Sequence, residues 1–211
     1  MAATATRRSS TLSKGEQTRQ AILTAAIYRF GRDGYRATSV ADIARDAGVG
    51  GTVAYAYFPN KEALFLAAID EDAAAVIEEG LFSVVSEREP HPQIEDWRQV
   101  LVYTLAGAVN GHPLARRVLA GLEPEVTERV LEIPALAELR KACTERIRSE
   151  QAAGTVRPDI DPVAIGNGVV SIVLSLLMSV VQVGANAAIA YGNDVAAVFE
   201  AALSPVIPPR Q

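Results

Sequence analysis

Apolar residues recur at four-residue spacing along much of this chain, and this spacing predicts helices with one buried face. The first such run, Ile22, Ala26 and Phe30, lies behind Ser13 and Glu16, which are spaced as a capping box at a helix start. The run ends among the glycines at positions 31 and 34. Almost every other element that can be recognised is helical too. The sequence therefore predicts an all-α fold.

Two short helices are expected next, with glycines between them. The first follows Ser39 and ends at the glycine at 48, and Asp42 makes a second possible capping box with Ser39. The second covers residues 51–58, with Ala54 and Phe58 on its inner side, and the proline at 59 closes it.

A longer helix is expected after Asn60, which can cap it. Its buried stripe is expected to comprise Leu64, Phe65, Ala68 and Ile69. Short helices joined by a tight turn and flanked by longer ones form a helix-turn-helix, here over residues 39–58, whose second helix enters the major groove of DNA. Spacing alone leaves a small helical bundle without DNA contact as an equal alternative.

The rest of the chain is helical but punctuated by prolines. Helices are expected near 93–110, 113–121, 124–132, 135–153, 162–184 and 194–203. We expect three parts: a flexible arm over 1–12, a DNA-binding domain over 13–75, and a helical body over 76–211.

Charge is divided unevenly along the chain. Residues 1–61 carry nine Lys and Arg against four acids, a net charge of +5, whereas the remainder carries eleven against twenty-one, a net charge of −10. Phosphate contacts supply most non-specific affinity for nucleic acid, so only the first part is expected to approach DNA. Chance clustering of charge is the alternative.

Several functional classes are disfavoured. His91 and His112 lack metal-binding spacing, no glycine loop for a nucleotide is present, and the lone Cys143 has no motif, so we expect no enzyme, metal or cofactor. Paired carboxylates such as Glu78 and Glu79, or Asp70 to Asp72, are interpreted as solvated helix faces. No apolar run follows the N-terminal arginines, and a single cysteine fits a reducing environment, so a cytoplasmic location is expected.

Residues 163–193 contain no charged side chain. A membrane span is disfavoured, because polar residues recur through the segment and flanking Lys and Arg are absent. A helix that is apolar on all sides must be covered, and a second subunit is the natural cover. The small residues Ser171, Ser175 and Ser179 would allow close packing of facing helices, with Leu174, Leu177 and Met178 facing elsewhere. We therefore expect a dimer interface at these three serines.

The run from Gly34 to Val49, continued from Tyr55 to Phe65, resembles the TetR family of bacterial regulators. The resemblance covers about fifty residues without insertion. It implies an N-terminal helix-turn-helix domain followed by a divergent helical domain that dimerises and holds an inducer. The expected function is a homodimeric repressor that leaves its double-stranded DNA operator when a small molecule binds. The alternative is an inducer-independent DNA organiser or activator.

The resemblance also implies which residues contact DNA. Tyr55, Tyr57, Lys61 and Thr38 resemble the family's phosphate contacts, although core packing of the tyrosines and capping by Thr38 are alternatives. The complete expected set is Thr38, Ser39, Gly50, Gly51, Thr52, Tyr55, Tyr57 and Lys61.

The second short helix departs from the family pattern. Gly50, Gly51, Thr52 and Val53 stand where the family usually has Ser, a basic residue, Gly, and Thr or Ser, and Ala56 replaces a larger polar residue. The basic side chain that reads guanine is therefore missing. Specificity is expected to depend on thymine methyls, backbone N–H groups and DNA shape. Two glycines should also weaken this helix by about 1 kcal/mol each relative to alanine, so it is expected to order fully only on DNA.

Inducer-binding residues cannot be transferred by motif. Trp97, Tyr103, Met178 and Gln182 could line an apolar cavity with a few polar groups, although core or interface packing is the ordinary alternative for each. The acidic body disfavours an anionic inducer, whereas Arg98, Arg116 and Arg117 would permit one.

Overall fold

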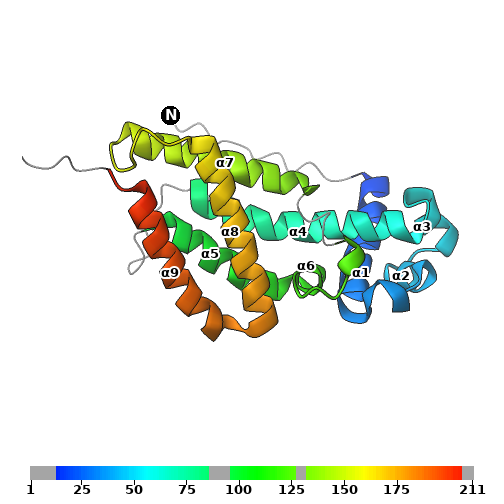
Figure 1. Cartoon of the computed structure of the whole chain (residues 1–211). Helices are drawn as coiled ribbons and strands as arrows, with labels where there is room; N and C mark the ends of the chain where they lie inside the picture. The colour runs from blue at the N-terminus through cyan, green and yellow to red at the C-terminus, as the bar shows by residue number, and fades with distance from the viewer. Residues whose placement is uncertain (1–12, 86–95, 127–131, 206–211) are drawn as a thin grey trace, which may run out of the picture. The chain divides into compact units, whose positions relative to one another are not determined.

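A computed structural model describes residues 13–85, 96–126 and 132–205. The predicted arm over 1–12 lies outside these ranges. Every regular element within them is helical, which confirms the all-α prediction (Figure 1). The chain divides into two compact units, 1–68 and 69–211, which we call the first and the second unit. Both this division and the boundary expected at 75 fall inside one long helix.

The first unit begins with α1 (Lys14–Ala37). The predicted capping box is present: Ser13 N donates to Glu16 Oε2 at 2.7 Å, and Glu16 N donates to Ser13 Oγ at 3.2 Å. The hydroxyl and the backbone N–H of Ser13 both stabilise the Glu16 carboxylate by hydrogen bonding, which lowers the pKa of Glu16. The buried face holds Ile22, Ala26 and Phe30, as the periodicity predicted. Helical geometry breaks at Gly34, whose φ of 84° is accessible to glycine at little cost.

Three helices follow, α2 (Val40–Asp46), α3 (Gly51–Tyr57) and α4 (Lys61–Val85). Asn60 caps α4 as predicted, because its Oδ1 accepts a hydrogen bond from Ala63 N at 2.7 Å. The expected stripe of α4, which comprises Leu64, Phe65, Ala68 and Ile69, is buried. The rings of Phe30, Tyr35 and Phe65 cluster with centroids 4.7–6.1 Å apart, so α4 is fixed against the end of α1.

The second unit continues α4 and adds the remaining helices. These are α5 (Trp97–Ala108), the 3-10 helix η1 (Val109–Gly111), α6 (Pro113–Leu119), the 3-10 helix η2 (Pro124–Val126), α7 (Pro134–Ala152), α8 (Pro162–Val183) and α9 (Ala185–Leu203). In Figure 1, α8 crosses the face of the unit and packs against α5, α7 and α9.

Two of the expected helices differ from the structure. The helix near 124–132 is a single 3-10 turn over 124–126, and residues 127–131 lie outside the described ranges. The helix expected at 194–203 begins nine residues earlier, at Ala185. Gly184 explains the difference, because its φ of 96° ends α8 and lets the chain re-enter a helix at the next residue.

The packing of α7 on α8 requires a glycine, and this gives a first prediction. A Cβ at Gly166 would lie 2.6 Å from Thr144 Oγ1 and 2.8 Å from Thr144 N, and the backbone nitrogen cannot move alone. Gly166→Ala should therefore destabilise the protein by about 1–3 kcal/mol in urea denaturation. Gly107→Ala in α5 is the matched control, because a Cβ there meets nothing within 4 Å. It should be neutral or stabilising by up to about 1 kcal/mol. Equal effects of the two variants would contradict the close approach.

Candidate nucleic-acid interface

The turn between α2 and α3 presents α3 at the surface of the first unit. Gly48 has a φ of 68°, and the backbone N–H groups of Gly48 and Val49 donate back to the end of α2, to Arg45 O and Ala44 O. Gly50 then precedes α3, and its carbonyl accepts from Val53 N and Ala54 N. The glycine-containing turn predicted from the sequence is therefore the tight turn that joins the two helices of a helix-turn-helix.

Most of α3 is exposed. Ala54 is completely buried, and Phe58 just after the helix is 4% exposed, which confirms the two predicted inner positions. Thr52, Tyr55 and Ala56 are exposed, and so is Val53. A seven-residue helix that buries so little of itself presents nearly its whole outer surface to a ligand. Its hydrogen-bonding side chains are one threonine hydroxyl and the phenols of its tyrosines.

The start of α2 is held by local hydrogen bonds. Thr38 is 2% exposed, and its hydroxyl donates to Gly34 O at 2.8 Å. Ser39 caps α2, because its Oγ accepts from Asp42 N at 3.1 Å. The carboxylate of Asp42 accepts the Ser39 hydroxyl at 2.6 Å, in place of the backbone N–H that a capping box would use, and this bond lowers the pKa of Asp42. Both hydroxyls are thus engaged within the chain, and their contacts with DNA stay a prediction.

The remaining expected phosphate contacts lie around α3. Tyr55 is 53% exposed. The hydroxyl of Tyr57 lies beside the first turn of α1, 3.5 Å from the Cβ position of Gly15. The ammonium of Lys61 lies 4.3 Å from the centroid of the Tyr35 ring. Tyr57, the last residue of α3, therefore lies against the first turn of α1, and Lys61, the first residue of α4, lies against Tyr35, whereas Tyr55 is exposed on α3.

An ion pair between α1 and α2 was not foreseen from the sequence. Arg29 and Asp46 form two hydrogen bonds, at 2.6 and 3.0 Å. The hydrogen bond from Arg29 lowers the pKa of the Asp46 carboxyl and raises that of the guanidinium. A paired, planar contact of this kind orients α2 on α1. Residues seventeen positions apart give no periodic signal, so the sequence offered no means of finding it.

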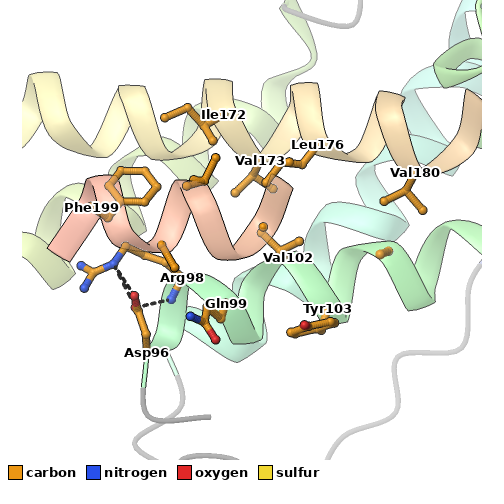
Figure 2. Close-up of a pocket in the computed structure, with 14 residues that line it drawn as sticks. Asp96, Arg98, Gln99, Val102, Tyr103, Ile172, Val173, Leu176, Val180 and Phe199 are labelled. Atoms are coloured by element: carbon orange, nitrogen blue, oxygen red, sulfur yellow. Dashed lines mark hydrogen bonds and ion pairs between the residues drawn. The ribbon is translucent and has the colours of Figure 1, made fainter. Parts of the chain in front are cut away.

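The four residues expected to bind an inducer lie in different surroundings. Trp97 is buried, with its Nε1 donating to Glu150 Oε1 at 2.8 Å. Gln182 donates to Leu119 O at 2.9 Å, and Met178 is partly exposed on α8. Tyr103 lines an apolar cavity of about 150 Å³ between α5, α8 and α9 (Figure 2). A second apolar cavity, of about 60 Å³, lies among α4 to α8.

The serines expected at a dimer interface lie along one side of α8. Ser171 and Ser175 are exposed and Ser179 is partly exposed. Each hydroxyl donates to the carbonyl four residues earlier, at 3.0 Å. Their hydrogen-bonding needs are met within the helix, so the stripe offers a small, nearly apolar surface.

Other chemistry is sparse in the part of the chain that the structure describes. No group of three or more His, Cys, Asp or Glu there is placed to hold a metal ion. Cys143 is buried, and burial raises the pKa of its thiol to about 12, which makes it unreactive.

Comparisons with known proteins agree with this geometry. Residues 22–68 match the model of the family described as bacterial regulatory proteins, tetR family. The chain is also 36% identical over 83 residues to the HTH-type transcriptional repressor AcnR of Corynebacterium diphtheriae. That alignment covers 37% of this chain and 44% of the relative, so the chain matches less than half the length of this curated protein.

Solved structures with the same fold cover both units. A TetR-family regulator from Mesorhizobium loti has a TM-score of 0.71 at 18% identity, covering 92% of this chain and all of that one. One from Cytophaga hutchinsonii has a TM-score of 0.67 at 19% identity, covering 92% and 98%. An ArpA-like gamma-butyrolactone receptor has a TM-score of 0.55 at 24% identity, covering 92% of each chain. These likenesses show the fold.

Proposed function

We propose that the chain, a TetR-family transcriptional regulator, acts as a homodimeric repressor that binds double-stranded DNA and leaves it when a small molecule binds. The observation that carries the proposal is the exposed outer surface of α3, set by the Gly48 turn on a basic segment of an otherwise acidic chain. A helix presented in this way fits the major groove.

The side chains around α3 suggest how DNA is held. We propose that Tyr55, Tyr57 and Lys61 contact phosphates, and that Thr52 faces the bases. Gly51 has open space at its Cβ position, so the backbone at the start of α3 can approach the DNA closely. Without an arginine to pair with guanine, recognition then depends on thymine methyls and on the shape of the groove.

The exposed apolar surface of α8 supports a dimer. Among the described residues, α8 is the one helix that is long and apolar enough to span a membrane by length and composition. Only one third of its most apolar stretch is buried within the chain. A long apolar helix that a single chain leaves largely uncovered is typical of a protein–protein interface. We propose that a second copy covers the Ser171 and Ser175 side of α8, as a two-fold interface permits.

Ligand response would couple the two units. One solved structure of the same fold is a gamma-butyrolactone receptor, and the second unit of this chain contains two apolar cavities. We propose that a ligand favours a body conformation in which the two α3 helices of the dimer no longer match successive major grooves. Since α4 is continuous from Lys61 to Val85, it is the element through which such a change would pass.

Selection of binding sites from random double-stranded DNA, followed by fluorescence polarisation, tests the proposal. A repressor dimer should enrich a two-fold symmetric site with half-sites about one or two helical turns apart. Affinity should fall steeply with salt, as expected for several phosphate contacts. Failure to enrich any site, together with salt-independent binding, would refute DNA recognition by this chain.

Thr52 provides a sharper prediction about sequence preference. Thr52→Val keeps the methyl group and the shape of the side chain but removes the hydroxyl, whereas Thr52→Ser keeps the hydroxyl and removes the methyl. If Thr52 contacts a thymine methyl, Thr52→Ser should lose about 1 kcal/mol of preference at one base pair and Thr52→Val should retain it. Binding to a set of singly substituted operators measures both. A uniform loss across all operators would instead assign Thr52 a non-specific role.

A further inference from the structure

The cavity between α5, α8 and α9 has apolar walls and a charged end. Val173, Leu176 and Val180 of α8 and Phe199 of α9 form apolar walls, and Val102 and Ala106 of α5 complete them. Figure 2 shows the ion pair between Asp96 and Arg98 at one end of α5, with Tyr103 farther along the same helix. At about 150 Å³, the cavity has the size that binds benzene-like molecules in other apolar protein interiors.

The charged end of the cavity is already neutralised. Nε of Arg98 lies 2.9 Å from Asp96 Oδ1, and its NH1 lies 3.3 Å from Glu150 Oε2. The guanidinium also lies 5.2 and 5.9 Å from the ring centroids of Trp97 and Phe199. An anionic ligand would have to displace a carboxylate or lie beside two of them, at a cost that one arginine cannot offset.

Two neutral side chains at the cavity are not engaged. Gln99 and Tyr103 are one helical turn apart on α5, and neither side chain forms a hydrogen bond within the described residues. An amide and a phenol can each donate and accept, so they suit a carbonyl, amide or hydroxyl group. They offer no charge to complement an ion.

From this arrangement we infer that the cavity takes a small uncharged amphiphile, with one aromatic ring or short alkyl chain and one neutral hydrogen-bonding group. The ring or chain lies between the α8 and α9 walls, and the polar group faces Gln99 and Tyr103. This inference rests on the proposed function for its role as effector, but binding itself can be measured without DNA.

Benzamide and benzoate test the inference, because they share a skeleton and differ in charge at about pH 7.5. In ligand-detected NMR titrations, benzamide should bind at least about tenfold more tightly than benzoate. Asp96→Asn keeps a good helix N-cap but removes one of the two carboxylates beside Arg98, and should improve benzoate binding about tenfold while leaving benzamide unchanged. Tighter binding of benzoate to the unmodified chain, or no gain from Asp96→Asn, would overturn the inference.

Position is tested by filling each cavity. Ala106→Phe should abolish benzamide binding, whereas Ala73→Phe, which fills the smaller cavity, should leave it intact. The reverse pattern would overturn the assignment to the larger cavity. Circular dichroism checks that each variant is folded, and if Ala106→Phe is not, Tyr103→Phe on the exposed rim should still weaken benzamide several-fold. If benzamide binds as expected but does not release DNA, the inference stands and ligand control of repression fails.

Discussion

Ser175→Arg should convert the protein into a monomer and reduce operator affinity about a hundredfold or more. Ser175 is exposed on α8 in the single chain, so arginine there should not disturb the fold of the monomer. Across a two-fold interface, however, the two arginines would face each other on apolar surface without partners. A monomer binds one half-site and loses the gain in effective concentration that links two binding events. Sedimentation equilibrium and operator titration measure the two effects.

The same replacement at Ser149 provides the matched control. Ser149 is exposed on α7, so Ser149→Arg changes the net charge equally without touching the proposed interface. It should leave the dimer and the operator affinity unchanged, apart from a slight gain from the added positive charge. A dimer that persists in Ser175→Arg would place the interface elsewhere. Loss of DNA binding in both variants would show that charge on this unit, not dimerisation, controls affinity.

Local sequence signals predicted the first unit in detail. The Ser13 and Glu16 capping box, the Asn60 cap and the inner position of Ala54 all depend on residues within a few positions of one another. Such short-range signals depend little on the rest of the fold, because each one satisfies backbone groups at a helix end or buries one face of its own helix. The resemblance over the same residues placed them on a known fold, which the match to residues 22–68 confirms.

The second unit shows where such signals end. From the sequence, Trp97, Tyr103, Met178 and Gln182 were candidates to line one cavity. Of these four, only Tyr103 lines the cavity between α5, α8 and α9. Trp97 and Gln182 instead form hydrogen bonds with residues 53 and 63 positions away. Most of the side chains that enclose the larger cavity are ordinary aliphatic residues on three helices, and nothing in their local spacing distinguishes a cavity wall from a core. Whether such a side chain lines a cavity or fills the core depends on how the helices pack.

Asp72 is the strongest case of a role that only the tertiary structure reveals, and Asp72→Ala should destabilise the protein by about 3 kcal/mol. Asp72 of α4 is 4% exposed, so the interpretation of this carboxylate as part of a solvated helix face is wrong. Its Oδ2 accepts from the backbone N–H groups of Leu114 and Ala115 at 3.0 and 2.8 Å, and its Oδ1 lies 2.8 Å from His112 Nδ1. Because α6 has no side-chain cap from a neighbouring residue, Asp72 supplies it from forty-two positions away.

Thermal and urea denaturation measure the loss, which should lower the melting temperature by about 10 °C for a chain of this size. Glu78→Ala, which removes an exposed carboxylate from the same helix, should change stability by less than about 0.5 kcal/mol. Asp72→Asn should fall between them, since its amide keeps one acceptor oxygen but brings a donor toward the α6 N–H groups. Hydrogen exchange at Leu114 and Ala115 should accelerate first in both Asp72 variants. Unchanged exchange there would mean that water replaces the carboxylate, and that α4 does not hold the start of α6.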